Sequence, residues 1–295
     1  MIDAPDVMFP NLGIEIMNQS RVAFTLFGFQ VYWYGIIIGI AVLAGLLWGG
    51  YMEPRRAGQK PDYYVDFFFY VVPICVICAR LYYVIFSWSE YKNDLLKIFM
   101  FREGGLAIYG AIIAAPLTAY VYCKIRKLNF RLFADTGVLG LLLGQAIGRW
   151  GNFINHEVFG DYTDSLFAMR YQIESVNASD LTQKILDNLV SYKEALYIQV
   201  HPAFLYESVW NILLFIALSI YRRHKKFDGE ILALYLFGYG VGRFFIEGLR
   251  TDQLKFFGTG FPVSQLISIL MIAGSTAFII YGRKTLDKTA ELSLK

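Results

Sequence analysis

Charge is scarce in this chain. Only 17% of its 295 residues are Asp, Glu, Lys or Arg, whereas 56% are hydrophobic and the mean hydropathy is +0.45. The charges lie between long uncharged runs, which argues against a soluble domain and is typical of a protein that crosses a membrane several times. The net charge of +3 becomes informative only when it is divided between the two sides of that membrane.

Cysteine and histidine are scarce as well. Three cysteines cannot build a disulfide framework, and the Cys75-x-x-Cys78 pair lies in an apolar run without a second pair, so we interpret it as packing rather than metal binding. The three histidines, His156, His201 and His224, show no metal-ligand spacing, and no metal or cofactor is expected. The N-terminus shows neither the basic segment nor the small-residue cleavage site of a signal peptide, so we expect the first apolar helix to remain in the mature protein.

Apolar runs of about 20 residues predict an all-α polytopic membrane protein with seven transmembrane helices in one integral membrane domain, 1–295. The expected helices cover roughly residues 30–51, 66–88, 104–123, 132–148, 202–221, 231–250 and 262–282. Residues 1–20 are expected to form an irregular or interfacial arm. The polar interval 150–200, between the fourth and fifth spans, is expected to form a small extracytoplasmic head with a surface helix over 179–196 and Ser179 as its cap.

Basic residues give the predicted chain its orientation. Fourteen of the 27 Lys and Arg residues follow the odd-numbered spans: Arg55, Arg56, Lys60, Lys124, Arg126, Lys127, Arg131, Arg222, Arg223, Lys225, Lys226, Arg283, Lys284 and Lys288. Because short basic segments stay on the cytoplasmic side, the N-terminus should face outward and the C-terminus the cytoplasm. The polar interval and its neighbours then lie at the outer side.

The stretch 148–157 holds the densest polar cluster, at the end of an apolar run. It offers the guanidinium of Arg149, the carboxamides of Asn152 and Asn155, the imidazole of His156 and the carboxylate of Glu157. Such groups persist near lipid only where they satisfy one another or a substrate, and an arginine fork suits a phosphate. The stretch is therefore either the anion-binding part of an active site or a polar interface loop that contacts lipid headgroups.

Further polar residues fall at the same predicted depth. Arg243, Glu247 and Arg250 share one helix face and form either a closed ion network or one that leaves an arginine free for an anion. Glu207 lies inside a span and needs a partner, for which Arg80, Arg149 and Arg243 are candidates. Tyr34 is either a site residue or part of the aromatic belt at the membrane surface. Three glycines spaced four residues apart, Gly140, Gly144 and Gly148, predict a face of close contact with another helix.

These residues resemble the prolipoprotein diacylglyceryl transferase family, in an ordered set that covers nearly the whole chain. The matching segments are Gly148-Arg149-x-Gly151-Asn152-Phe153-Ile154-Asn155-x-Glu157, Trp33-Tyr34-Gly35, Arg80-Leu81-Tyr82-Tyr83-Val84, Gly104-Gly105, His201-Pro202 through Tyr206-Glu207, and Gly238-Tyr239-Gly240 through Arg243, Glu247 and Arg250. The resemblance implies a bacterial cytoplasmic-membrane enzyme with its site toward the outer side. Its implied partners are phosphatidylglycerol, the lipobox of a prolipoprotein and the bilayer, with no nucleic acid.

The resemblance also implies the reaction and the site. A diacylglyceryl group moves from phosphatidylglycerol to the lipobox cysteine thiol, giving a thioether and glycerol-1-phosphate, in the first step of lipoprotein maturation. Arg149, Arg243, Tyr109 and Glu157 are implied as catalytic. The residues implied to bind phosphatidylglycerol are Arg149, Arg243, Tyr34, Asn152, Gly160, Glu207, Tyr239, Glu247 and Arg250.

One position departs from the family, because many members carry His where this chain has Tyr109. An unperturbed tyrosine, with a pKa of ~10, is a poor base near neutral pH. Tyr109 then either orients the substrate, with His156 or Glu157 taking the proton, or carries the proton itself. The alternative to an enzyme is a small-anion or lipid transporter or channel, which the lack of an internal repeat disfavours.

Overall fold

The computed structural model describes residues 4–100, 104–256 and 260–293, with side chains up to residue 286. It is mostly helical, and six of its described helices are long and apolar enough to cross a membrane. These spans are Trp33–Arg56, Asp62–Phe86, Ile108–Arg126, Phe130–Asn155, Ala203–His224 and Val263–Leu286. The chain divides into two compact units, Met1–Gly45 with Leu141–Lys295, and Leu46–Gly140.

The sixth predicted span exists as helix α9 (Glu230–Glu247), although it is not among these six. It is 18 residues long and carries Glu230, Arg243 and Glu247, so its hydropathy is interrupted by charge. All three side chains have partners within the first unit. The expectation of seven membrane spans and of the outward N-terminus stays a prediction.

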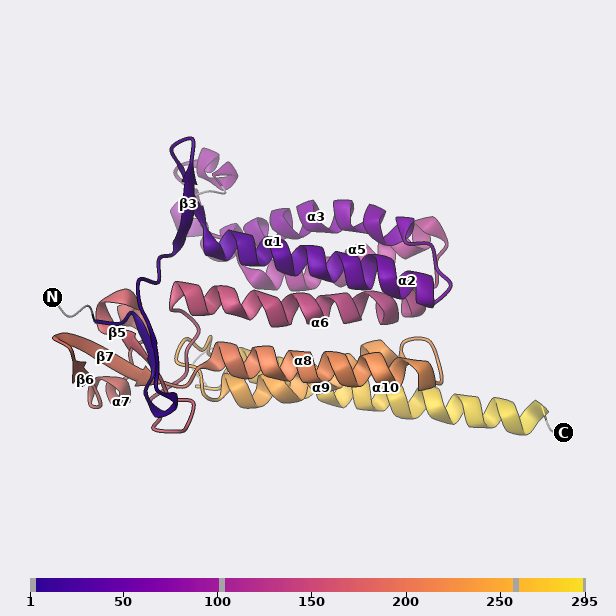
Figure 1. Cartoon of the computed structure of the whole chain (residues 1–295). Coiled ribbons are helices and arrows are strands. Elements are labelled where there is room, and N and C mark those ends of the chain that lie inside the picture. The colour runs from indigo at the N-terminus through magenta and orange to yellow at the C-terminus, as the bar shows by residue number, and fades with distance from the viewer. Residues whose placement is uncertain (1–3, 101–103, 257–259, 294–295) are drawn as a thin grey trace. The chain divides into compact units, whose positions relative to one another are not determined.

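In the first unit, α8 (Ala203–Tyr221), α9 and α10 (Val263–Ser293) run side by side, as Figure 1 shows. Helix α1 (Trp33–Gly45) packs on the final turns of α6 (Phe130–Asn155) through the predicted glycine face. A Cβ added to Gly144 would lie 3.3 Å from the carbonyl oxygen of Ala41, and one added to Gly148 would lie 3.7 Å from Ile38. The expected close helix contact is thus confirmed.

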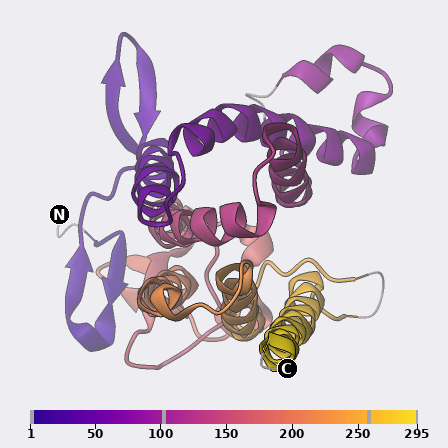
Figure 2. The same cartoon turned by 90° about the vertical axis from the view of Figure 1, so that its right-hand side faces the viewer.

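The all-α prediction is wrong for the polar parts of the first unit. A five-stranded antiparallel sheet has the order β2-β1-β5-β7-β6. Its strands are Ile14–Ile16, Val7–Phe9, Met169–Gln172, Ala195–Val200 and Val190–Tyr192. A separate hairpin pairs β3 (Val22–Leu26) with β4 (Phe29–Tyr32), and the two N-terminal hairpins appear as distinct indigo arrows in Figure 2. The arm over residues 1–20 is therefore not wholly irregular, because Val7–Phe9 and Ile14–Ile16 form strands.

The helix predicted over 179–196 is wrong too. Thr182, rather than Ser179, caps a helix of only four residues, α7 (Gln183–Leu186), by accepting a hydrogen bond from the Ile185 amide at 3.2 Å. The chain then turns into β6 and β7. Tyr197, Ile198 and Val200 of β7 are buried, and aromatic and β-branched residues favour a strand that is covered on both faces.

The sheet packs onto the ends of two membrane helices. Its buried residues form one core with Phe153 of α6 and Phe204 of α8, whose ring centroids are 4.7 Å apart. Because this contact lies where α6 ends and α8 begins, it fixes the two helix ends next to each other. Arg149 lies one turn before Phe153, and Glu207 follows Phe204 by three residues, so the same packing positions the polar cluster.

The second unit contains a π-helical turn (Leu46–Met52), α2 (Glu53–Arg56), α3 (Asp62–Phe86), α4 (Trp88–Tyr91), a 3₁₀ turn (Leu95–Phe99), α5 (Ile108–Arg126) and the start of α6. Helices α3 and α5 approach each other closely at Cys78, since a Cβ on Gly110 would collide with its backbone carbonyl. Arg80 is buried and donates hydrogen bonds to the backbone carbonyls of Lys97, Ile98, Met100, Gly104 and Gly105. These contacts do not include Glu207, for which Arg80 was one candidate partner.

Candidate active site

The polar cluster lies where three helices of the first unit approach the sheet. Arg149 and Asn152 lie on the last two turns of α6, because that helix continues to Asn155 rather than ending at 148 as predicted. Glu207 lies on the second turn of α8, and Arg243 and Glu247 lie on the last turns of α9. Residues separated by about 100 positions of the chain thus meet at the ends of these three helices.

Glu207 is the centre of this cluster. Its carboxylate forms ion pairs with Arg149 and with Arg243, the latter with an Nη1–Oε1 distance of 2.6 Å. The Arg250 guanidinium approaches the same oxygen to 3.8 Å. Two of the three candidate partners of Glu207 are confirmed by these contacts, and the interaction ties α6, α8 and α9 together.

The remaining contacts close the ion network. Arg243 also pairs with Glu247, and Arg250 forms a bidentate pair with Asp252, with donor–acceptor distances of 2.8 and 2.6 Å. Three guanidinium groups thus face three carboxylates, as in the closed-network alternative. Buried ion pairs are stable only with such compensation.

Arg149 and Arg243 nevertheless keep unused hydrogen-bond donors and are partly exposed. The Arg149 and Arg243 side chains are 22% and 15% exposed, whereas that of Glu207 is 4% exposed. Each of these two arginines engages its two terminal nitrogens, while the Nε–H group has no partner among the described residues. A guanidinium has five N–H donors, so the carboxylates hold the two arginines in place without using all of their donors, and the remaining donors are available for an anion.

A second row of polar contacts extends from Arg149 toward the sheet. The Arg149 Nη1 group donates to Asn152 Oδ1 at 3.4 Å, and the Asn152 amide donates to Glu157 at 2.8 Å. Asn155 approaches the same carboxylate at 3.5 Å. Tyr34 of α1 lies beside this row, since a Cβ on Gly151 would lie 2.8 Å from its ring. The predicted residues of α1 and α6 are therefore neighbours.

Gly160 joins the segments that carry His201 and Arg250. The Gly160 amide donates to the His201 carbonyl at 2.9 Å, and the Asp161 amide donates to the Leu249 carbonyl at 2.8 Å. Gly160 and Arg250 form an isolated β-bridge. A Cβ on Gly160 would lie 2.8 Å from that of His201 and 2.9 Å from the Leu249 oxygen, so only glycine fits here without a shift.

His156 faces the sheet. Its Nδ1 lies 2.8 Å from Ser175 Oγ, which donates to the Gln172 carbonyl, and its ring stacks on Tyr171 with centroids 4.3 Å apart. Since Ser175 spends its only proton on that carbonyl, His156 Nδ1 carries the donated proton. Burial, and secondarily the charge of Arg21, lower the pKa of His156 to about 4. Its Nε2 has no partner among the described residues.

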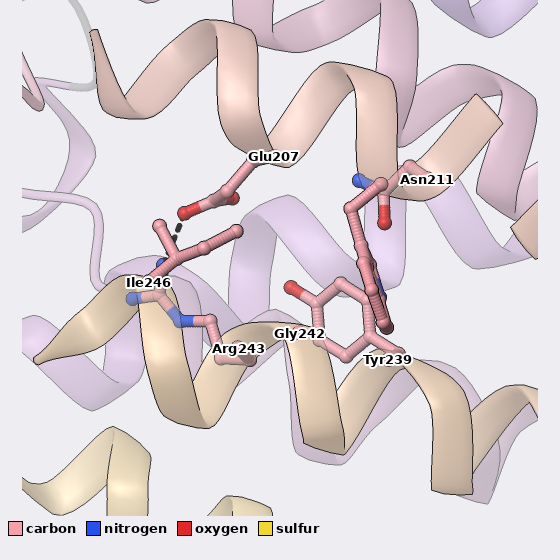
Figure 3. A pocket seen from close by; sticks show the side chains of 7 residues that line it. Glu207, Asn211, Tyr239, Gly242, Arg243 and Ile246 are labelled. Atoms are coloured by element: carbon pink, nitrogen blue, oxygen red, sulfur yellow. Dashed lines mark hydrogen bonds and ion pairs between the residues drawn. The ribbon is translucent and has the colours of Figure 1, made fainter. Parts of the chain in front are cut away.

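A small pocket opens between α8 and α9 beside the ion network. It is lined by Glu207, Trp210, Asn211, Tyr239, Gly242, Arg243 and Ile246, most of which are labelled in Figure 3. Tyr239 is thereby brought to the cluster, as predicted. Asn211 was missed by the sequence reasoning, although its position four residues after Glu207 on an apolar helix was a usable signal.

Tyr109 belongs to the second unit and occupies the first turn of α5, with its ring 6.2 Å from that of Tyr82. Its role stays a prediction. Among the described residues, no group of three or more His, Cys, Asp or Glu side chains has the arrangement of a metal site.

Comparison with known proteins gives one consistent result. A family model described as prolipoprotein diacylglyceryl transferase matches residues 21–281. A phosphatidylglycerol–prolipoprotein diacylglyceryl transferase of Clostridioides difficile is 40% identical over 274 residues, which cover 92% of this chain and 100% of the relative. Proteins of the same name from Bacillus cereus and Listeria monocytogenes are 44% and 42% identical, and each alignment covers 94% of the relative and at least 92% of this chain.

Proposed function

This chain belongs to the prolipoprotein diacylglyceryl transferase family and is a transferase, and from that premise we propose that it transfers the diacylglyceryl group of phosphatidylglycerol to the lipobox cysteine of a prolipoprotein. The thiolate sulfur attacks the glyceryl carbon that is bonded to the phosphate oxygen. The C–S bond forms, the C–O bond breaks with its electron pair going to the phosphate, and glycerol-1-phosphate leaves. The thiol proton passes to a base.

The observation that carries this proposal is the arginine cluster around Glu207. A leaving phosphate gains negative charge in the transition state, and preorganised donors in a dry site stabilise that charge most. Arg149 and Arg243 are held by Glu207 and Glu247, are partly exposed, and keep N–H groups that have no partner among the described residues. We assign the phosphate to these two arginines, because Arg250 is already occupied by its bidentate pair with Asp252.

The other predicted residues take positioning roles in this proposal. Asn152 and Glu157 orient Arg149 through their hydrogen bonds, and Gly160 fixes the segment that carries Arg250. Tyr34 and Tyr239 border the lipid headgroup. Two residues near the cluster are candidates for accepting the thiol proton. Glu157 is connected to Arg149 through Asn152, whereas the contacts of His156 are with the sheet. Glu157 is therefore the better supported of these two, with Tyr109 as the third candidate.

The proposed setting is the bacterial cytoplasmic membrane. We propose seven membrane spans, with α9 as the sixth, an outward N-terminus and a cytoplasmic C-terminus. The segment 150–200 is then an extracytoplasmic head inserted in a single membrane domain, and the active site opens to the outer side. A prolipoprotein exported across the membrane presents its lipobox on that side.

Incubation of the purified protein with headgroup-labelled phosphatidylglycerol and a lipobox peptide tests the reaction. We expect release of labelled glycerol phosphate together with a peptide whose mass increases by one diacylglyceryl group. Arg149→Ala should abolish both products, while Arg126→Ala, which breaks an exposed ion pair with Asp66, should leave both unchanged. Label release without peptide modification would contradict the proposed transfer.

A further inference from the structure

Asn211 is a polar side chain that the ion network does not use. It is 2% exposed and lies in the apolar helix α8, yet its carboxamide has no hydrogen-bond partner among the described residues. It lines the pocket between α8 and α9 (Figure 3). A buried amide without a partner is costly, so an unpaired carboxamide that faces a pocket indicates a ligand.

Tyr239 lines the same pocket from α9, and its hydroxyl has no hydrogen-bond partner among the described residues either. Its ring is fixed by stacking on Tyr235, with centroids 5.6 Å apart. The carboxamide supplies two N–H donors and the phenol one O–H donor. The pocket therefore offers neutral donors beside the charged donors of Arg243.

The depth of these donors identifies what they can bind. Asn211 follows Glu207 by four residues, and Tyr239 precedes Arg243 by four on an adjacent antiparallel helix, so both lie one turn, about 6 Å, from the arginine level. That direction leads away from the sheet, which joins α8 through β7. A sheet with unpaired edges cannot lie in lipid, so the pocket lies on the hydrocarbon side of the arginines.

A glycerolipid has its ester groups on the hydrocarbon side of its phosphate, separated by roughly one glycerol unit. Its headgroup lies on the opposite side. We infer that Asn211, assisted by Tyr239, binds an ester carbonyl of the diacylglyceryl group while the phosphate lies on Arg149 and Arg243. This inference rests on the proposed function and adds a residue that distinguishes an ester-linked from an ether-linked lipid.

Diester and diether phosphatidylglycerol with equal chain lengths test this assignment, because the diether lipid lacks the carbonyl acceptors. In mixed micelles we expect kcat/KM for the diester lipid to exceed that for the diether lipid by about tenfold, the usual effect of one hydrogen bond. Asn211→Leu should reduce this ratio to near one by slowing the diester reaction. The control Leu213→Ala, at an exposed position of the same helix, should keep the tenfold ratio.

Equal rates with both lipids in the unaltered protein would overturn the assignment, and so would a diester preference that survives Asn211→Leu. Lipid binding without peptide, followed by native mass spectrometry, separates this inference from the reaction. Loss of transfer with an intact, Asn211-dependent diester preference in binding would contradict the proposed reaction alone. Equal binding of both lipids by a protein that transfers the diacylglyceryl group would contradict the ester subsite alone.

Discussion

The arginines of the cluster contact different acceptors through separate nitrogens of one rigid, planar guanidinium, whereas a lysine offers a single nitrogen that acts as a compact point charge. Arg149 contacts Glu207 and Asn152 through different nitrogens, and Arg243 contacts Glu207 and Glu247. Arg149→Lys should therefore lower lipid transfer about 10²–10³-fold, the usual loss when a preorganised donor is removed. Membrane insertion, measured in parallel, should be unaffected. Full activity of Arg149→Lys would show that a point charge suffices at this position.

Tyr109 distinguishes two ways of removing the thiol proton. If its hydroxyl only orients the lipid, as we expect, Tyr109→Phe should slow transfer about tenfold, which corresponds to one lost hydrogen bond. Tyr109→His should then stay active without a new limb in the pH–rate profile. A new limb near the imidazole pKa, or a complete loss of turnover in Tyr109→Phe, would identify position 109 as the proton acceptor.

His156 should make the head domain acid-sensitive. Its folded pKa is lowered from 6.5 to about 4 by burial, so the unfolded chain binds a proton first as the pH falls through 6.5. The free energy of unfolding then decreases between pH 6.5 and 4, by up to about 3 kcal/mol, and this group has no effect above that window.

His156→Asn removes the titrating group, and asparagine tolerates the positive φ of 56° at this position. We expect a smaller loss of thermal stability between pH 7 and 4.5 in this variant than in the unaltered protein. His224→Asn, at an exposed site, should retain the full loss. An unchanged pH dependence in His156→Asn would mean that carboxylates alone cause the acid sensitivity.

At the scale of single residues, the sequence predicted the chemistry better than the pairing. The requirement that Glu207 have an arginine partner follows from the cost of a lone charge in lipid. Arg80 is likewise a charge inside an apolar helix, and it donates to backbone carbonyls of the connector that follows its helix. These contacts could not be predicted, because the connector has no recognisable sequence pattern. Asn211 is harder to predict, since a single amide has no charge to neutralise and only its helical spacing from Glu207 points to it.

Gly160 is the point where three segments of the site meet, and it can be tested as a structural element. A Cβ there would press on His201 and on the Leu249 carbonyl at less than 3 Å. Gly160→Ala should cost about 1–3 kcal/mol of stability and slow transfer by shifting Arg250. Gly137→Ala, where a Cβ meets no atom within 4 Å, should be neutral or stabilising by up to about 1 kcal/mol. Equal stability of both variants would show that the segments around Gly160, His201 and Leu249 can move apart at no cost in stability.

At the scale of elements, long helices were predictable and short strands were not. The apolar runs of α3, α5 and α8 carry their own signal in about 20 residues. Strands β1 and β5 are three and four residues long and pair across more than 150 positions of chain, so no local pattern announces them. The helix expected from Ser179 starts only at Gln183, with Thr182 as its cap, and ends after one turn.

At the scale of the whole molecule, the hydropathy pattern fixes a membrane protein, whereas its orientation rests on the basic residues alone. Ser191 lies in β6 of the head, and Lys284 lies near the end of α10; both are exposed. If seven spans separate the termini, these two positions lie on opposite sides of the membrane. The segment around Ser191 should then face outward and Lys284 the cytoplasm.

Single-cysteine labelling measures this orientation directly. In a chain whose Cys75, Cys78 and Cys123 are replaced by Ala, Ser191→Cys should react with a membrane-impermeant maleimide in intact spheroplasts. Lys284→Cys should react only after the membrane is opened, while a permeant maleimide should label both. Because six spans would place both ends of the chain on one side, labelling of both cysteines in intact spheroplasts would show that α9 does not cross. The outward position of the arginine cluster would then need another explanation.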